Sequence, residues 1–395
     1  MRVAVFANLP PGGARRAAYE LIRHTAGDYD YDFHRIDFPQ AGDRLAAGQD
    51  IGSLVKEVFD YPFRPAAAGP DSVRRVLDIR AMASLQEDVA RAIDERDYDL
   101  VFVHHDRLTH APPVLRFLRT PSLYYLQEPR RQSFEYTMMH RRRPAAGVGP
   151  KAARLAASTF DLWMKEADIR ASRAATHLVA NSHHSAESIY RAYGRHPAVS
   201  YLGVDDEVFC LGEAEREGVL AVGALDPIKG HDLTIEAIGC LPAADRPPLT
   251  LVFDRERPGV RDRLVALAGE RGVDLRLRGG IGDRELVELY QSSVATICAA
   301  AVEPFGLTTI ESLACGTPVI AVNEGGYREV VRHGDNGLLV DRRPDRVAAG
   351  VAEVLRRPDR WSGAELRSSV LPFFSWEAAG DRIRPVLDEA AGHRG

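Results

Sequence analysis

The chain has 395 residues, of which 45% are hydrophobic and 27% charged, and its formal net charge is −5. This length and composition predict an ordinary globular protein of about two or three domains. The acidic balance argues against nucleic acid as a main partner, because proteins that bind nucleic acid usually carry a strong positive field.

The chain opens with an apolar run at residues 3–7, which is too short for the core of a signal peptide. No window approaches the ~20 apolar residues that a membrane-spanning helix needs. The four cysteines are scattered, with no CxxC pair and no nearby pair of histidines, so we expect neither a metal site nor a disulfide framework. These features predict a cytoplasmic protein.

Short apolar runs alternate with helical segments through the first half of the chain. A Pro/Gly turn and a helical stretch follow the first run, and the pattern then recurs. The strand-like runs are residues 3–7, 100–103, 122–126 and 177–180, and the helical segments are residues 14–24, 81–93 and 187–193. Such alternation predicts a parallel, doubly wound α/β sheet.

A basic segment at residues 130–173 differs from the rest of the chain. It holds ten Lys or Arg residues against four Asp or Glu residues. Large apolar side chains are interleaved with these charges: Phe134, Tyr136, Met138, Met139 and Trp163. The plainer interpretation is a solvated helical hairpin that caps the first domain. The alternative is a docking surface for an anionic membrane, here the inner leaflet, or for an anionic acceptor.

The strand–helix alternation restarts at Gly218, after a polar stretch at residues 203–217 that we expect to join two domains. The strand-like runs of the second half are residues 219–222, 249–253, 275–277, 294–298 and 319–322, with a helix at residues 232–238. The whole chain is therefore expected to form two α/β domains, an arrangement that often places a ligand site in the cleft between them.

The most informative stretch is EPFGLTTIESLACGTPV, which starts at Glu303 and follows the strand-like run at residues 294–298. It is predicted to lead into a helix whose first backbone N–H groups lie in the stretch Phe305, Gly306, Leu307 and Thr308. Such a helix end carries about half a positive charge and suits a diphosphate. The glycine would let a ligand approach the backbone closely.

Two glutamates flank this predicted helix end, Glu303 in the loop and Glu311 one turn inside the helix. Each carboxylate has two acceptor oxygens, which suit vicinal hydroxyl groups. A nucleotide sugar carries sugar hydroxyls, a diphosphate and a ribose in this order, which would match one glutamate, the helix end and the other glutamate. The spacing alone nevertheless favours the plainer interpretation, in which Glu303 caps the helix and Glu311 lies on the surface.

This stretch resembles the E-x7-E signature of retaining GT-B glycosyltransferases, the group 1 glycosyl transferases of glycosyltransferase family 4. Further segments resemble the family in the same order: VANS at residues 179–182, GVD at 203–205 with Phe209, VGALDPIKG at 222–230, GG at 325–326 with Glu329, NGLLV at 336–340 and FSWE at 374–377. The resemblance is dense from about residue 176 onward. Before that it rests on GGA at residues 12–14 and YYLQEP at residues 124–129.

The resemblance implies a GT-B fold, an α/β architecture of two facing Rossmann-like, doubly wound domains. Residues 1–205 would form the N-terminal, acceptor-side domain. Residues 206–375 would form the C-terminal domain that binds the nucleotide sugar, and a helix at residues 376–395 would cross back to the first domain.

The resemblance also implies roles for particular residues of the second domain. Glu303 would hold hydroxyls of the donor sugar, and Glu311 would hold the ribose. Lys229 would neutralise the donor diphosphate. The main-chain N–H groups that would cradle this diphosphate belong to Phe305, Gly306, Leu307 and Thr308.

In the first domain, Gly12 and Gly13 would form the small-residue loop that faces the diphosphate, although an ordinary turn fits them equally well. Gln127 occupies a place near the donor sugar where the family often has a histidine. A glutamine can hydrogen-bond a hydroxyl but cannot shuttle a proton at neutral pH. His104 and His105 end a strand-like run and are either ligand contacts or a structural or solvated pair.

A second departure from the family is Ala224, which stands where the family has an arginine in the loop of Lys229. One of two expected phosphate cations is therefore missing from that loop. The candidates for the missing positive charge are Arg15, Arg16 and Arg130.

The activity that the resemblance implies is transfer of a hexose-type sugar, with retention, from a nucleoside diphosphate sugar to a hydroxyl of a glycan, lipid or small-molecule acceptor. No cofactor beyond this donor substrate is expected, and no metal if Lys229 and the helix end carry the charge of the leaving group. One alternative is a catalytically weak binding subunit, which Ala224 and Gln127 favour. Another is a GT-B sugar-nucleotide epimerase, which the E-x7-E and GVD segments fit less well.

Overall fold

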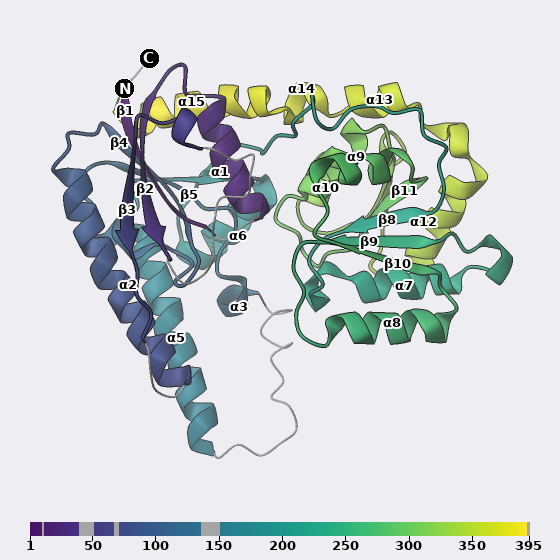
Figure 1. Cartoon of the computed structure of the whole chain (residues 1–395), viewed down its shortest axis with the longest axis horizontal. Coiled ribbons are helices and arrows are strands. Elements are labelled where there is room, and N and C mark those ends of the chain that lie inside the picture. The colour runs from purple at the N-terminus through teal and green to yellow at the C-terminus, as the bar shows by residue number, and fades with distance from the viewer. Residues whose placement is uncertain (10–11, 39–50, 67–70, 136–150, 393–395) are drawn as a thin grey trace. The chain divides into compact units, whose positions relative to one another are not determined.

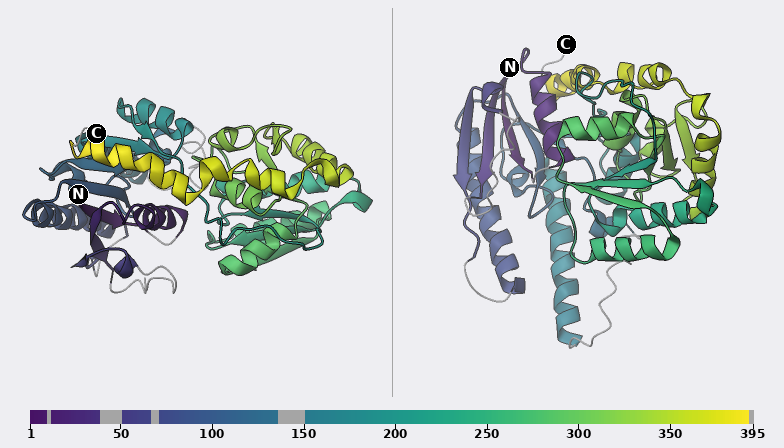
Figure 2. Two further views of the ribbon diagram at one scale, coloured as in Figure 1. Left: turned by 90° about the horizontal axis from the view of Figure 1, so that it is seen from above. Right: turned by 45° about the vertical axis from the view of Figure 1, so that its right-hand side comes forward.

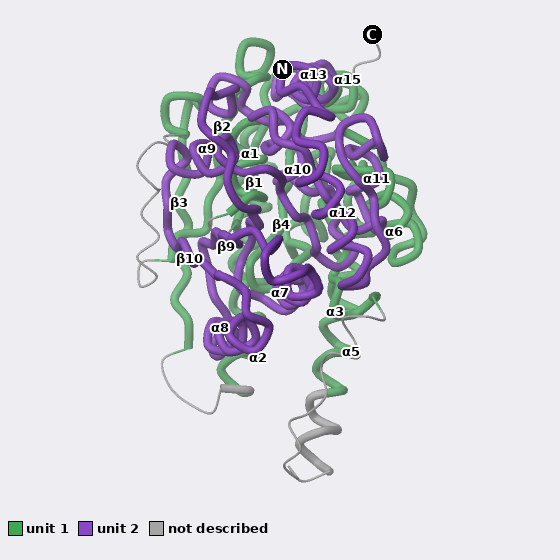
Figure 3. The backbone as a smooth tube through the Cα atoms, turned by 90° about the vertical axis from the view of Figure 1, so that its right-hand side faces the viewer, with its two compact units in different colours: residues 1–200, 380–395 green, residues 201–379 purple. Residues whose placement is uncertain are grey.

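The computed structural model describes residues 1–9, 12–38, 51–66, 71–135 and 151–392 (Figure 1). The chain divides into two compact units, one of residues 1–200 with 380–395 and the other of residues 201–379 (Figure 3). The sequence-based boundaries lie at residues 205 and 375, and the acceptor-side and donor-side roles of the two units remain predictions. Each unit has its own sheet.

The first unit is built on a seven-stranded sheet of order β3-β2-β1-β4-β5-β6-β7, in which all strand pairs are parallel. Its strands are β1 (Arg2–Asn8), β2 (Asp30–Asp37), β3 (Glu57–Pro62), β4 (Leu100–Asp106), β5 (Ser122–Tyr125), β6 (His177–Ala180) and β7 (Ala198–Val199). The strand order reverses between β1 and β4. Ligands usually bind beyond the carboxyl ends of the strands at such a reversal.

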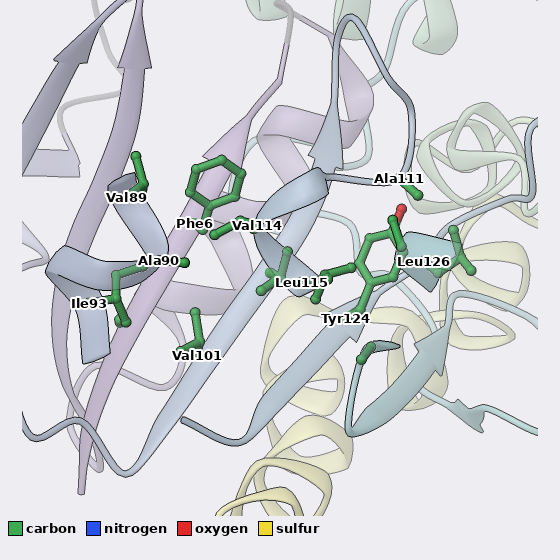
Figure 4. Close-up of a cluster of buried hydrophobic side chains, with 14 of the residues drawn as sticks. Phe6, Val89, Ala90, Ile93, Val101, Ala111, Val114, Leu115, Tyr124 and Leu126 are labelled. Carbon is green, nitrogen blue, oxygen red and sulfur yellow. The ribbon is translucent and has the colours of Figure 1, made fainter. Parts of the chain in front are cut away.

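Helices cover both faces of this sheet (Figure 2). They are α1 (Gly13–Arg23), α2 (Asp71–Asp94), α3 (Arg131–Phe134), α5 (Lys151–Ala174) and α6 (His183–Tyr193). Because both faces are covered, the central strands bury nearly every side chain, which explains their continuous apolar runs. Figure 4 shows part of this core, where Phe6, Val101, Val114, Leu115 and Tyr124 are at most 2% exposed.

The strands β2 and β3 are missing from the sequence prediction, because their polar residues hide the pattern. Asp32 and His34 of β2 are buried, and both have polar partners. The Tyr98 hydroxyl donates to Asp32 at 2.8 Å, and the Tyr61 hydroxyl lies 3.0 Å from Nδ1 of His34. Burial lowers the pKa of His34 to about 3, so the ring is neutral and tolerated inside the sheet.

The second unit has a six-stranded sheet of order β10-β9-β8-β11-β12-β13, again with parallel pairs only. Its strands are β8 (Val219–Val222), β9 (Leu249–Phe253), β10 (Leu275–Gly279), β11 (Ala295–Cys298), β12 (Val319–Val322) and β13 (Gly337–Val340). Its helices are α7 (His231–Cys240), α8 (Val260–Arg271), α9 (Asp283–Gln291), α10 (Leu307–Ala314), α11 (Tyr327–Val330), α12 (Pro344–Arg356), α13 (Gly363–Ser368) and α14 (Leu371–Phe374). Here the strand order reverses between β8 and β11.

The chain returns to the first unit within α15 (Trp376–Ala390), whose residues from Gly380 onward belong to that unit. The Arg384 guanidinium donates to the His24 carbonyl at 2.7 Å and to Asp28 at 2.6 Å. These bonds fix the last turns of α15 beside the end of α1. The predicted C-terminal helix that crosses back is thus present.

Candidate active site

Two loops meet at the carboxyl edge of the second unit's sheet. Residues 223–230 follow β8, and residues 299–306 follow β11. The Ala301 N–H donates to the Ile228 carbonyl at 2.8 Å and joins the two loops. Because β8 and β11 flank the reversal of strand order, these loops occupy the place where doubly wound sheets usually bind ligands.

Lys229 and Glu303 form an ion pair across the two loops. The Lys229 Nζ atom lies 2.9 Å from Oε2 and 3.1 Å from Oε1 of Glu303. The side chains are 30% and 18% exposed. The Asp226 carboxylate accepts from the Ile228 N–H and so caps the 3₁₀ turn that carries Lys229. A partly exposed pair of this kind adds little stability, and its charges remain accessible to a ligand.

Close backbone contacts hold the main chain of Glu303. Gly325 has φ +59°, and a Cβ atom there would lie 2.3 Å from the Glu303 carbonyl oxygen. The next N–H, that of Gly326, donates to the same oxygen at 2.7 Å. On the other side, a Cβ atom on Gly230 would lie 2.0 Å from the Ala299 carbonyl oxygen. Only glycine permits these approaches.

The residue before Glu303 is strained. Val302 has φ +48°, in the left-handed region that β-branched residues rarely adopt. Arg342 compensates by donating to the carbonyls of Ala299 and Ala300 at 2.9 and 2.6 Å, and to Glu324 at 2.9 Å. Strain of this kind costs about 1–3 kcal/mol and persists where the surroundings impose it, often at functional sites. The sequence prediction missed Arg342, since nothing in its local pattern marks it.

The helix α10 begins immediately after this loop. Gly306 is its N-cap, with φ +98° and no side-chain cap, so the interpretation of Glu303 as a helix cap is wrong. The first N–H groups of a helix, here those of Leu307 and Thr308, lack acceptors within the helix and form its positive end. The Phe305 side chain is 2% exposed and packs 5.8 Å from the ring of Phe374. Phe305 therefore offers a ligand its main chain alone.

Glu311 lies one turn inside α10 and is 9% exposed, so the interpretation as a surface residue is also wrong. Its Oε2 atom accepts from the Tyr290 hydroxyl of α9 at 2.9 Å. Burial, with the Glu311 carboxylate beside it, raises the pKa of Tyr290 well above its usual range. Tyr290 therefore stays protonated. Its hydroxyl donates a hydrogen bond to Glu311, and this bond holds the carboxylate in place.

Ala224 leaves its loop without a second cation. The neighbouring carbonyls of Gly223 and Ala224 lie 3.1 and 3.2 Å from Nε2 of His231. Burial lowers the pKa of His231, so the ring is a neutral hydrogen-bond donor to this loop. Lys229 is then the only lysine or arginine within residues 223–230.

The predicted site residues of the first unit lie beyond the carboxyl ends of its strands. Gly12 is the N-cap of α1, with φ +138°, and Gly13 is the first residue of that helix. Gln127 follows β5, and its N–H donates to Nε2 of His105 at 2.9 Å. Arg15 and Arg130 are 9% and 7% exposed. Whether these arginines or Arg16 neutralise a phosphate remains a prediction.

His104 and His105 are both buried, which rules out a solvated pair. The His104 ring packs 4.5 Å from the Phe102 ring, and burial lowers its pKa to about 3. Burial also holds the pKa of His105 well below its usual value. Both rings are therefore neutral, and His105 fixes the backbone of Gln127.

The basic segment is described only in part. Residues 136–150, which include Tyr136, Met138 and Met139, lie outside the described residues. Phe134 packs 5.4 Å from the Tyr193 ring, and Lys165 Nζ lies 4.7 Å from the Phe134 ring centre. Trp163 of α5 is 38% exposed. Both interpretations of this segment, cap and anionic docking surface, remain predictions.

Among the described residues, no three or more His, Cys, Asp or Glu side chains gather in a way that could hold a metal ion. None of the described helices combines the length and the apolar character needed to cross a bilayer.

Solved structures share the fold of this chain over nearly its whole length. HepE from Anabaena, solved with UDP and glucose, has a TM-score of 0.73 and 18% identity, covering 98% of this chain and 99% of that one. Sucrose-phosphate synthase from Thermosynechococcus elongatus has a TM-score of 0.76 and 18% identity, with 100% of both chains covered. The predicted α/β fold with two Rossmann-like units is confirmed as a GT-B fold.

The family match lies within the second unit. Residues 210–368 match the family model described as glycosyl transferases group 1. The D-inositol 3-phosphate glycosyltransferase of Thermobispora bispora is 33% identical over 202 residues, 45% of this chain and 44% of that protein. The enzyme of the same name from Acidothermus cellulolyticus is 33% identical over 268 residues, 58% and 56% of the two chains. The chain thus spans about half the length of the curated relatives it matches. Residues 210–368 are thus similar to the group 1 glycosyl transferases, and the GT-B fold agrees with this similarity.

Proposed function

We propose that this protein is a retaining glycosyltransferase of family 4 that moves a hexose-type sugar from a nucleoside diphosphate sugar to an acceptor hydroxyl. The observation that carries the proposal is the Glu303–Lys229 ion pair beside the N-terminus of α10, with Glu311 one turn further along that helix. These groups suit the sugar hydroxyls, the diphosphate and the ribose of such a donor.

The charges of this site support a reaction in which the diphosphate is the leaving group. Lys229 Nζ and the N–H groups of Leu307 and Thr308 neutralise the phosphates. Because the phosphates compete with Glu303 for the Lys229 ammonium, donor binding loosens the ion pair. The Glu303 carboxylate then accepts hydrogen bonds from hydroxyls of the sugar.

Bond making and breaking follow from the same arrangement. The bond between C1 of the sugar and the diphosphate oxygen breaks, and the positive groups stabilise the charge that develops on that oxygen. The acceptor oxygen bonds to C1 on the face that the diphosphate leaves, and its proton passes to a phosphate oxygen. Configuration at C1 is therefore retained, with no carboxylate nucleophile and no cofactor in the proposal.

The relatives support the classes of donor and acceptor. HepE has also been solved with UDP-glucose, and the two bacterial relatives are named for D-inositol 3-phosphate, a phosphorylated polyol. We infer a nucleotide-sugar donor and an acceptor with free hydroxyls, which a glycan, a lipid or a small molecule can supply. Contact with an anionic membrane through the basic segment is a separate expectation.

A catalytically weak binding subunit is the second candidate, because Ala224 and Gln127 replace two residues that the family often uses. A screen of UDP, GDP and ADP sugars, with the matching free diphosphates, separates the candidates. A ligand at about 100 times its Kd stabilises the native state by about 2.7 kcal/mol, which a thermal unfolding assay detects.

We expect one nucleotide series to stabilise the protein and its sugar to be transferred, with retention, to an acceptor from a panel. A stabilising donor that is never consumed would indicate a binding subunit. Release of an epimer without acceptor would indicate an epimerase. If no nucleotide stabilised the protein, the proposal would fail.

Replacing Glu311 with alanine is expected to weaken binding of the free nucleoside diphosphate. A hydrogen bond to a charged group contributes about 1.5–3 kcal/mol, which corresponds to about 10- to 150-fold in Kd. Isothermal titration measures the loss. Glu288→Ala, on the same helix α9 as Tyr290, serves as the control because the exposed Glu288 side chain pairs with Arg284 at 3.2 Å on the surface. An unchanged Kd in Glu311→Ala would reject the ribose role.

A further inference from the structure

The chain turns sharply between the strand β11 and Glu303. Nη1 and Nη2 of Arg342 lie 2.9 and 2.6 Å from the carbonyl oxygens of Ala299 and Ala300, the first two residues after the strand. Successive carbonyls of an extended strand point to opposite sides, so two neighbours can share one guanidinium only where the strand geometry has ended. The Arg342 side chain therefore holds a turn.

This turn ends in a strained residue. Val302 has φ +48°, which a β-branched residue adopts only where its surroundings impose it. The next residue is Glu303, whose carboxylate lies 2.9 Å from Lys229 Nζ. The direction in which a side chain leaves the chain depends on the backbone dihedrals around it. The turn therefore determines where the Glu303 carboxylate lies.

Glu324 holds Arg342 from the other side. The Arg342 Nε atom lies 3.0 and 2.9 Å from the two carboxylate oxygens of Glu324. One of these oxygens also accepts from the Val302 N–H at 3.4 Å. Glu324 and Arg342 each lie two residues beyond the end of a strand, β12 and β13 respectively, and these strands follow β11 in the sheet. We call this pair the Arg342 clamp, because it ties three neighbouring loops together.

The clamp depends on the shape of the arginine side chain more than on its charge. The Arg342 and Glu324 side chains are 25% and 32% exposed, and the charge attraction of such a pair adds little stability. All three guanidinium nitrogens, however, face protein acceptors, which uses the rigid fork that only arginine has. A lysine could carry the charge but could not hold both carbonyls and the carboxylate in this geometry.

We propose that Arg342, held by Glu324, is a positioning residue for the donor sugar: it maintains the strained turn at Val302 and thereby the place of the Glu303 carboxylate. The inference deepens the proposed function and rests on it, because it requires Glu303 to bind hydroxyls of that sugar. A group displaced by about 1 Å can lose up to about 100-fold in rate. The alternative is that the clamp only stabilises the second unit.

The test compares full-length wild type with Arg342→Ala and with Arg342→Lys, which keeps the charge and serves if the alanine variant fails to fold. Arg343→Ala is the matched control, because Arg343 is the next residue and pairs with Asp345 at 3.1 Å on the surface. Val302→Gly, alone and combined with each Arg342 variant, relieves the strain, since glycine adopts a positive φ freely.

The first readout needs neither donor nor turnover. Crystal structures of the ligand-free variants show the φ of Val302 and the distance between Glu303 and Lys229 directly. We expect both Arg342 variants to lose the left-handed turn and the ion pair, and Arg343→Ala to keep both. The turn should return when Val302→Gly is added. If the Arg342 variants kept the turn and the ion pair, the inference would be overturned, even for an active transferase.

The second readout uses the donor and acceptor found by the screen. We expect Arg342→Ala and Arg342→Lys to lower kcat about tenfold, with the Kd of the free nucleoside diphosphate unchanged. Adding Val302→Gly should recover about threefold of this loss, because the two residues act through one turn and their effects are then not additive.

Three kinetic results would contradict the positioning role. A lower melting temperature with unchanged kcat would show that the clamp is only structural. A raised Kd of the free diphosphate would mean that Arg342 itself binds phosphate. Strictly additive effects of Val302→Gly and Arg342→Ala would separate the arginine from the turn. Failure of the proposed function would appear elsewhere, in wild type, as the absence of nucleotide binding.

Discussion

Replacing Lys229 with alanine is expected to lower kcat/KM for the nucleotide-sugar donor by about 10²- to 10³-fold, the effect of removing one preorganised positive group from a developing oxyanion. We expect a loss near the upper end of this range, because Ala224 leaves Lys229 as the sole lysine or arginine of its loop. Steady-state kinetics measure it. Arg263→Ala is the control, since Arg263 pairs with Asp232 at 3.4 Å on the surface of the same unit.

Restoring a cation in the same loop provides the stronger test. Ala224 adjoins Gly223, where a Cβ atom would lie 3.4 Å from Cγ and Cδ of Lys229. We expect a guanidinium introduced by Ala224→Arg, which belongs to the same loop, to supply the missing positive charge to the donor phosphates. We expect Ala224→Arg to recover about tenfold of the activity lost in Lys229→Ala, the equivalent of ~1.4 kcal/mol. A folded double variant without recovery would mean that the charge comes from elsewhere.

Glu303→Gln is expected to lower kcat by about 10- to 100-fold, because the neutral amide loses a charge-assisted hydrogen bond to the donor sugar. Binding of the free nucleoside diphosphate should be unchanged or tighter. The substitution frees the Lys229 ammonium, now 2.9 Å from Glu303, and removes a negative charge next to the phosphates. Kinetics and isothermal titration of the same protein sample measure both quantities.

The contrast with Glu311→Ala makes this prediction specific. The two carboxylates are expected to have different roles. If Glu303→Gln weakened diphosphate binding as much as Glu311→Ala does, this division of roles would be contradicted. Measuring the melting temperature of each variant provides the folding control.

The parallel strands with continuous apolar runs could be predicted from the sequence. Strands that are buried on both faces consist almost entirely of apolar residues, and such runs are easily recognised. The strand β2 could not, since Asp32 and His34 interrupt its apolar pattern. Their partner Tyr98 lies more than sixty residues away in the chain. Buried polar residues that are satisfied by distant partners are invisible to any local pattern.

In the candidate site, too, local features could be predicted from the sequence and contacts between distant residues could not. The predicted loop and helix around Glu303 and Glu311 are present, because strand, glycine and helix signals are local. The ion pair of Glu303 with Lys229 joins residues 74 positions apart and appears only in the folded chain. The pairing of Glu311 with Tyr290 and the strained φ of Val302 are likewise products of packing. The sequence therefore indicated the kind of chemistry, and the fold supplied its arrangement.

Calorimetric titration of wild type and of Glu311→Ala with UDP, GDP and ADP, and with their sugar conjugates, tests the central claim most directly. If the edge of the sheet at β8 and β11 is the donor site, one nucleotide binds wild type and its Kd rises at least tenfold in Glu311→Ala, while Glu288→Ala binds as wild type does. If no nucleotide binds, or if Glu311→Ala binds as tightly as wild type, the donor site is not where we place it.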